Sequence, residues 1–234
     1  VFSQEERVAI EGLLAQVTAL DVLEVKAALG AETTTRAAYK VEQGVAIVPL
    51  SGPMLPERDA LLDFIGADYS VTPEVMRAVQ AADADPNVAS IFLAVDSPGG
   101  SVVGVEALAQ AVGQALKPTH AHGMGLMASA AYWASVRADR VTLEPYSIGG
   151  SIGAMTTVDD SSEAFEAEGV KRHLIATGPL KGQGTPGVKV SAEYLAQVQG
   201  LVEAHFEPFK AVVSEGRGLT GDALAAVTTG GVWM

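Results

Sequence analysis

Short runs of apolar, often β-branched residues alternate along the chain with segments whose apolar residues recur every three to four positions. Such runs are typical of buried strands, and the spaced segments are typical of amphipathic helices. We expect strands over 45–50, 88–95, 119–124, 140–143 and 171–176, with a further extended segment over 155–158. We expect helices from Thr72 to the turn at 83–87, and over 102–116, 130–136, 161–168 and 191–215. This alternation predicts right-handed βαβ units and an α/β fold with a mostly parallel sheet and flanking helices.

Start signals and apolar stripes define two of these helices further. At 72–74, Thr-Pro-Glu supplies a cap residue, a proline at the first helical position and an acidic residue in the first turn. The residues expected to face the core from this helix are Val75, Met76, Val79 and Ala82. In the helix over 191–215, where Pro208 predicts a kink, they are Leu195, Val198, Leu201, Val202, Phe206, Phe209 and Val213. Between elements, 52–68 predicts a loop or flap and 147–153 a glycine-rich loop.

The first residues form a separate region. Residues 5–29 have helical apolar spacing, and 30–35 have little apolar content and predict a linker. We therefore divide the chain into an N-terminal helical arm with its linker at 1–38 and a second domain at 39–234. Packing against the rest of the protein is the favoured role of the arm, and an oligomer contact is the alternative. The closing T-T-G-G-V-W-M predicts an element that continues beyond the last residue.

Charge and composition exclude several classes of function. The 234 residues carry a formal charge of −13, which repels nucleic acid and anionic membrane surfaces. Because there is no cysteine, disulfides, thiolate metal sites and cysteine nucleophiles are excluded. No apolar run approaches the ~20 residues of a membrane span, and the first residues lack the features of a signal peptide. We expect neither a nucleic-acid partner nor a membrane span.

A serine lies where the predicted strand at 119–124 gives way to the predicted helix at 130–136. The segment is G-M-G-L-M-A-S-A-A-Y-W-A, and the serine is Ser129. At a sharp strand-to-helix junction a serine presents its Oγ, and the amides of the first helical turn remain free to bind an anion. Ser129 is therefore a candidate nucleophile. The alternative is a helix start with small residues chosen for close packing.

A second turn offers the donors that an acyl-transfer serine needs. D-S-P-G-G-S at 96–101 follows the strand expected at 88–95 and precedes a helix, a place where α/β sheets gather ligands. An N–H from the Gly99-Gly100 pair and the N–H of Ala130 together predict an oxyanion hole. A simple tight turn is the alternative. Dinucleotide or phosphate binding is disfavoured because no G-x-G-x-x-G or G-K-[ST] occurs.

The serine also needs a base. His120 and His122 share one face of a strand but have no third metal ligand, so they are interpreted as surface or edge histidines. His205 is expected to pack near the stripe of its helix, and His173 to lie within a strand. Lys181, in the loop T-G-P-L-K-G-Q-G-T-P, is the remaining candidate, since a lysine acts as a base when burial favours its neutral form. A solvated loop lysine is the alternative.

Five blocks together resemble the signal peptide peptidase A family of serine peptidases, in order and in spacing. They are D-S-P-G-G-S-V, M-A-S-A-A-Y-W-A-S, A-D-R-V, G-S-I-G-A and T-G-P-L-K-G-Q-G-T-P. The opening V-A-I-V-P-L-S-G and the domain length look most like the phage and prophage branch of head-maturation or scaffold proteases. The resemblance covers about residues 40–234.

The resemblance implies a Clp/crotonase-type spiral α/β fold and a Ser–Lys dyad, with no metal and no cofactor. Ser129 would be the nucleophile, Lys181 the general base, and Gly100 and Ala130 the oxyanion donors beside Gly99. Ser151 would help hold the lysine ammonium. This chain departs from the family in one respect, because Ala130 and Ala131 follow the serine where relatives commonly have two glycines. The family also usually continues into a closing segment past G-G-V-W-M.

The resemblance further implies a homo-oligomeric ring acting on protein or peptide substrates. The expected roles are phage capsid scaffold maturation or the degradation of peptides, including signal peptides. The expected location is the cytoplasm, or the virion or prohead if a phage encodes the chain. Three alternatives remain: a Clp-type Ser–His–Asp peptidase, disfavoured because no histidine lies about 25 residues after Ser129; a crotonase-like acyl-CoA enzyme; and an inactive structural relative serving as a scaffold or capsid component.

Overall fold

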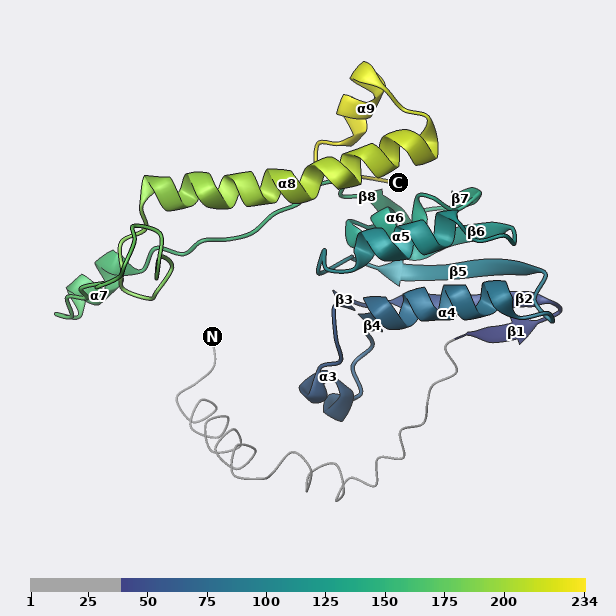
Figure 1. Cartoon of the computed structure of the whole chain (residues 1–234), viewed down its shortest axis with the longest axis horizontal. Helices are drawn as coiled ribbons and strands as arrows, with labels where there is room; N and C mark the ends of the chain where they lie inside the picture. The colour runs from purple at the N-terminus through teal and green to yellow at the C-terminus, as the bar shows by residue number, and fades with distance from the viewer. Residues whose placement is uncertain (1–38) are drawn as a thin grey trace. The chain divides into compact units, whose positions relative to one another are not determined.

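A seven-stranded sheet organises residues 39–234, the part of the chain that the structure, a computed structural model, describes (Figure 1). The helix expected over 5–29 and the linker after it lie outside these residues. The strands of the sheet are β1 (Lys40–Glu42), β2 (Val45–Ser51), β5 (Ser90–Ser97), β6 (Thr119–Ala128), β7 (Arg140–Leu143), β8 (Ile148–Gly150) and β9 (Val232–Trp233). Their order is β1-β2-β5-β6-β8-β9, with β7 also paired to β6. Only β1 and β9 run antiparallel to their neighbours, so the prediction of a mostly parallel sheet is confirmed.

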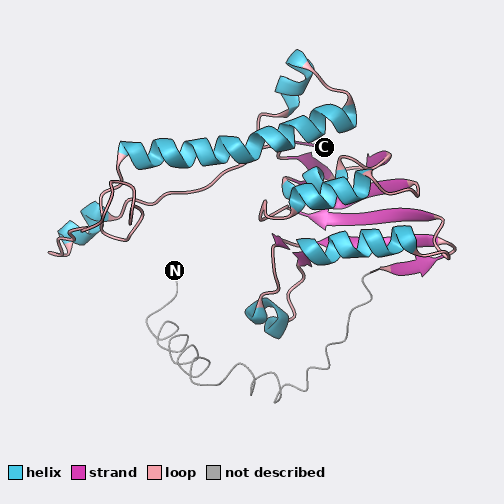
Figure 2. Ribbon diagram, viewed as in Figure 1, coloured by secondary structure: helices cyan, strands magenta, loops and turns pink. Residues whose placement is uncertain are grey.

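Three helices cover one face of this sheet. They are α4 (Thr72–Ala84), α5 (Val105–Gly113) and α6 (Ala130–Ser135), which lie in front of the strands in Figure 2. Alternate residues of the central strands are buried beneath them: Ala46, Val48 and Leu50 on β2, and Ile91, Leu93 and Val95 on β5. Successive side chains of a strand point to opposite faces, so the intervening residues, which are partly buried or exposed, line the other face of the sheet.

Element boundaries differ from the predictions in several places. Strand β6 continues four residues past the predicted end and reaches Ala128, whereas α5 is shorter than the predicted helix. Helix α4 begins one residue earlier than predicted, because Val71 occupies the cap position and Thr72 is the first helical residue. The hydroxyl of Thr72 is buried without a hydrogen-bond partner. The prediction of a threonine cap is therefore wrong, although the helix itself is confirmed.

The two predicted loops contain short regular elements. The flap at 52–68 includes β3 (Met54–Leu55) and α3 (Ala60–Ile65), and β4 (Ser70–Val71), which pairs with β3, returns the chain to α4. The glycine-rich loop at 147–153 includes β8, which pairs with the end of β6. Gly and Pro mark turns by conformation, but they do not exclude two- or three-residue strands between the turns.

The long helix α8 (Ala192–Arg217) runs through Pro208 and packs on α6 near its C-terminal end. Phe209 stacks on Trp133 of α6, with ring centroids 4.8 Å apart, and Val212 and Val213 are also buried. The predicted inward stripe is wrong in its first half, because Leu195 and Leu201 are 48% and 55% exposed. Helix α9 (Gly221–Val227) follows and leads to β9.

The segment from residue 153 to the start of α8 contains α7 (Ser162–Ala167) and otherwise no regular element. We call this segment the arm from here on, as distinct from the N-terminal helical arm predicted at 1–38. The strand predicted over 171–176 and the extended segment over 155–158 form no ladder, so these predictions are wrong. Ile175 is 96% exposed and Met155 88% exposed. The arm makes hydrogen bonds with itself, as from Arg172 to the carbonyl oxygen of Pro186 and from the Gly187 amide to Ser161.

No helix within residues 39–234 combines the length and the apolar character that crossing a membrane requires.

Candidate active site

Ser129 occupies the junction between β6 and α6, as the sequence predicts. Its backbone has φ 53° and ψ −126°, in the half of conformational space that glycine favours. Holding a serine there costs about 1–3 kcal/mol, and such strain is concentrated at functional sites. The Ser129 amide donates to the carbonyl oxygen of Gly150 (2.8 Å), and its own carbonyl accepts from the Trp133 amide (2.9 Å). The surrounding structure thus fixes this turn on both sides.

The two turns singled out in the sequence contact each other. Gly99 has φ +90°, and a Cβ added to it would lie 2.7 Å from both the Ser129 Cβ and the Ala130 nitrogen. Only glycine fits at this distance, because real Cβ atoms do not approach other heavy atoms so closely. The structure therefore packs Gly99 closely against the turn that carries Ser129.

The Gly100 N–H is left available by the pairing around it. Gly100 forms an isolated parallel bridge with Met54. The two hydrogen bonds of this bridge run from the Met54 amide to the Gly99 carbonyl and from the Ser101 amide to the Met54 carbonyl, each 2.8 Å. Neither uses the N–H of Gly100. Because Ala130 is the first residue of α6, its N–H has no partner within the helix either.

The two alanines that replace the usual glycines fit without strain. Ala130 and Ala131 lie in α6, and neither is among the described residues with positive φ. Both are buried, at 2% and 0% exposure. The methyl groups of Ala130 and Ala131 therefore fill core space, and their backbone needs no conformation that only glycine adopts.

A serine that sequence reasoning did not single out holds the glycine turn in place. Ser97 is fully buried, donates its hydroxyl proton to the carbonyl oxygen of Gly52 (2.6 Å), and accepts the Gly99 N–H (3.1 Å). The preceding residue, Asp96, joins this turn to β6, because its carboxylate accepts a hydrogen bond from the Leu126 amide at 3.0 Å. The only sequence signal for either residue was its place in D-S-P-G-G, next to the glycines.

Strand β9 supports the Ser129 turn from the other side. Strand β8 carries Gly150, the acceptor of the Ser129 amide, and pairs with β9. Gly150 has φ +110°, and a Cβ there would lie 2.5 Å from the Trp233 ring. Ser151, predicted as a supporting residue, is half-buried next to Gly150 with φ +51°, and its amide donates to the Gly231 carbonyl. Ser151 therefore lies in the segment adjoining Ser129.

Lys181 lies elsewhere, in the arm. Its side chain is exposed, and the loop around it packs on the arm itself and on the first turn of α8. The amide of Ser191, the cap of α8, donates to the side chain of Gln183, and Gly184 lies against Tyr194. No hydrogen bond joins this loop to the Ser129 turn within the described residues. A hollow of about 480 Å³ in the arm is lined by side chains of both charges, including Asp160 and Arg172, but by neither Ser129 nor Lys181.

The histidines do not approach Ser129 as bases. His120 and His122 both hydrogen-bond the Thr142 hydroxyl (2.7 Å each) from the first half of β6. At ~3.3 Å per strand residue, they are roughly 20–30 Å from Ser129 along β6. Burial, followed by the charges of Arg140 and His122, lowers the pKa of His120.

Several expectations for the histidines need correction. Because β6 lies between β5 and the strands β7 and β8, His120 and His122 are not edge residues. His205 is exposed and not packed, with its ring bonded to the Leu201 carbonyl, and His173 lies in irregular chain and not in a strand. Residues 39–234 contain no group of three potential ligands that could hold a metal ion.

Comparison with known proteins identifies the family of the chain. The family model "Peptidase family S49" matches residues 111–234, which include Ser129 and Lys181. The chain belongs to peptidase family S49. The resemblance to signal peptide peptidase A and its phage branch, predicted from the five sequence blocks, is confirmed.

Relatives in this family include phage and bacterial proteases. The chain is 30% identical to "Capsid assembly protease C" of Escherichia phage lambda, over 92% of this chain and 50% of that protein. It is 30% identical to "Protease 4" of Salmonella typhi, over 66% of this chain and 25% of that protein. It is also similar to "Head-tail preconnector protein GP5" of Enterobacteria phage P21, with 27% identity over 80% of this chain and 37% of that protein. The S49 chain thus spans at most about half the length of these relatives.

Proposed function

We propose that this S49 chain is a serine endopeptidase in which Ser129 is the nucleophile. The observation that carries the proposal is the strained backbone of Ser129 (φ 53°) in direct contact with Gly99. Backbone strain of this kind is concentrated at functional sites, so a role for the Ser129 hydroxyl explains the cost. Membership of a peptidase family and relatives named as proteases support the same role.

In the proposed reaction the Ser129 Oγ attacks the carbonyl carbon of the scissile peptide bond and gives its proton to a general base. The negative charge that develops on the carbonyl oxygen accepts hydrogen bonds from the N–H groups of Gly100 and Ala130. Removing one such donor in other enzymes costs roughly 100- to 1000-fold in rate. The base then returns the proton to the leaving amine. Water hydrolyses the resulting acyl-enzyme by the same steps.

We assign the role of general base to Lys181 and infer that it comes from a neighbouring copy of the chain. The lysine is exposed in the arm, and a lysine acts as a base only when its surroundings bury it. The arm and the first half of α8 also expose apolar side chains such as Ile175 and Leu201. A second copy packed against this surface would bury both the apolar residues and the lysine, with Ser151 close to the ammonium.

This assembly is expected to close into a homo-oligomeric ring of domains with the Clp/crotonase-type spiral fold. The parallel strands and the helices that connect them support that fold. By similarity to the phage relatives, the proposed substrates are proteins of the capsid scaffold, cleaved in the host cytoplasm or inside the prohead. Peptide degradation like that expected of signal peptide peptidases is the second candidate. The inactive scaffold alternative is not favoured, because the strained Ser129 turn is retained.

The nucleophile is tested by comparing the wild type with Ser129→Ala on a denatured protein substrate. We expect the variant to fold normally and to lose cleavage. Ser135→Ala is the matched control, because this serine lies in the following helix and its hydroxyl donates only to the Ala131 carbonyl. Residual cleavage by Ser129→Ala at the wild-type rate would contradict the assignment.

The base is tested by mixing two inactive variants, Ser129→Ala and Lys181→Ala. If the lysine acts on a neighbouring copy and subunits mix at random, about a quarter of the sites have both groups, and a similar share of activity returns. Lys189→Ala, in the same arm, should retain activity by itself. If Lys181→Ala is inactive and mixing restores nothing, the lysine acts within its own chain. If Lys181→Ala is fully active, the assignment of the base is wrong.

A further inference from the structure

The flap between β3 and β4 exposes a group of large apolar side chains. Leu61, Phe64 and Ile65 of α3 are 64%, 68% and 61% exposed, and the helix buries no side chain. A six-residue helix has little stability of its own, and burial of side chains does not stabilise α3 either. Exposed apolar groups of this size mark surfaces that bind another molecule.

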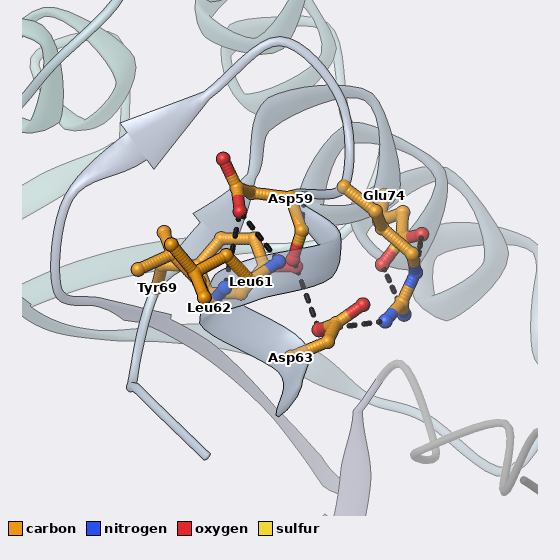
Figure 3. A network of polar contacts seen from close by, with 7 residues as sticks. Asp59, Leu61, Leu62, Asp63, Tyr69 and Glu74 are labelled. Atoms are coloured by element: carbon orange, nitrogen blue, oxygen red, sulfur yellow. Dashed lines mark hydrogen bonds and ion pairs between the residues drawn. The ribbon is translucent and has the colours of Figure 1, made fainter. Parts of the chain in front are cut away.

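Polar contacts hold α3 in shape (Figure 3). The carboxylate of Asp59 caps the helix by accepting two amides of the first turn, at 2.9 and 3.0 Å. The Tyr69 hydroxyl donates to Asp63 at 2.7 Å. Arg58 makes two hydrogen bonds of 2.9 Å with the Glu74 carboxylate, which joins the flap to α4. The apolar face is thus ordered before anything binds to it.

The base of the flap is bonded to the turn that supplies the proposed oxyanion donor. The Gly52 amide donates to the Asp96 carbonyl (2.9 Å), and Met54 pairs on both sides of Gly100. The base of the flap and the turn that carries Gly100 thus share a hydrogen-bonded backbone. This connection favours the substrate as the occupant of the flap.

Charge distinguishes between the possible occupants. The flap carries the carboxylates of Glu57, Asp59, Asp63 and Asp68, and its one cation, Arg58, is already paired with Glu74. The whole chain has a formal charge of −13. Two such flaps repel each other, as do a flap and an anionic bilayer. A polypeptide that combines apolar and basic residues is attracted both to the apolar face of α3 and to the carboxylates of the flap.

Building on the proposed peptidase function, we propose that the apolar face of α3 docks an apolar segment of the substrate that is flanked by lysine or arginine. The flap is then a specificity element remote from the scissile bond. It selects which polypeptides are held, while Ser129 cleaves whichever bond reaches it. Loss of the face should weaken the capture of long substrates without changing the chemical step.

The test uses the triple variant Leu61→Ser, Phe64→Ser, Ile65→Ser and two probes. One is a long peptide with a leucine-rich segment between lysine-rich flanks, followed by a cleavage sequence, and the other is the cleavage sequence alone. In the Ser129→Ala background, we expect the triple change to weaken binding of the long peptide by about tenfold or more. With Ser129 present, hydrolysis of the short peptide should be unchanged, and added salt should weaken wild-type capture of the long peptide.

Leu116→Ser is the matched control, because Leu116 is 93% exposed on the loop after α5, and it should change neither measurement. Unchanged binding of the long peptide by the triple variant would overturn the proposal. So would an equal loss on both peptides, or a smaller assembly by light scattering, which would make the face a contact between copies. If Ser129→Ala binds the long peptide through the flap but the wild type cleaves neither peptide, the docking stands and the peptidase function fails.

Discussion

Replacing Gly99 by alanine inserts a methyl group between the two turns of the candidate site. The added Cβ would lie 2.7 Å from the Ala130 nitrogen, 2.7 Å from the Ser129 Cβ and 2.8 Å from the Ala128 oxygen. All three neighbours belong to the turn that holds the nucleophile, and none is the end of a flexible side chain. The turns must therefore separate, which moves the Gly100 N–H away from the position it needs for the oxyanion.

The expected loss of stability in Gly99→Ala has two contributions. A φ of +90° costs an alanine about 1–2 kcal/mol, and overpacking costs a further 1–3 kcal/mol or so. The free energy of unfolding should therefore fall by about 2–5 kcal/mol. Misplacing one oxyanion donor lowers kcat by about 100-fold or more, with a smaller change in KM.

Gly104→Ala is the matched control, because it strains the backbone in the same way but introduces no steric clash. Gly104 has φ +81°, but a Cβ there would meet only the Thr72 methyl at 3.5 Å, an ordinary contact. This variant should lose about 1–2 kcal/mol of stability and keep its kcat. Urea unfolding and peptide hydrolysis of both variants provide the comparison. If Gly99→Ala keeps kcat within about threefold of the wild type, the contact between the turns is not catalytic and the argument from geometry is refuted.

Three further variants test other parts of the structure. Ser97→Ala leaves the buried Gly99 N–H without an acceptor, which should cost about 1–3 kcal/mol in urea unfolding and lower kcat more than it changes KM; an unchanged kcat would remove Ser97 as a positioning residue. Phe209→Ala deletes the ring stacked on Trp133 and should cost about 3–5 kcal/mol; a loss below about 1 kcal/mol would mean that α8 is anchored elsewhere. The fold lowers the pKa of His120, so the unfolded chain binds a proton on this ring more readily than the folded chain does. The contribution of neutral His120 to thermal stability should therefore be complete above about pH 6.5, and stability should fall as the pH drops below that value. His120→Gln should flatten that dependence, and an equally steep profile in this variant would assign it to another group.

Local pattern was enough to predict the centre of the fold and the meeting of the two turns. The β-branched run that became β5 is buried on alternate residues, and helix α6 starts directly after Ser129 as expected. Gly99 lies against the serine turn, so its position could be inferred from residue type and from the adjacency of the two strands in a parallel sheet. The two alanines after Ser129 depart from the family pattern, yet a helical backbone accommodates them.

The predictions that failed concern segments whose partner the local pattern does not identify. Residues 171–176 have extended-chain propensity but no neighbouring strand with which to pair. The stripe of α8 shows which residues share a helix face, but only its C-terminal part, around Phe209, meets α6. Periodicity does not say which surface a face will meet. Ser97 escaped notice for a different reason, because its two hydrogen bonds depend on backbone groups of the flap and the glycine turn that only the fold brings together.

The support that β9 gives to the nucleophile has a consequence for the order in which the protein matures. Val232 and Trp233 pair with β8, whose Gly150 accepts the Ser129 amide, so the serine turn depends on residues made roughly 100 positions later. At ~5–20 residues per second of synthesis, about 5–20 s separate the appearance of the serine from that of the strand that completes its surroundings. A nascent chain therefore carries its serine on an unfinished turn while it is still on the ribosome. If Ser129 acts as proposed, synthesis of the chain by itself delays cleavage until β9 has been made.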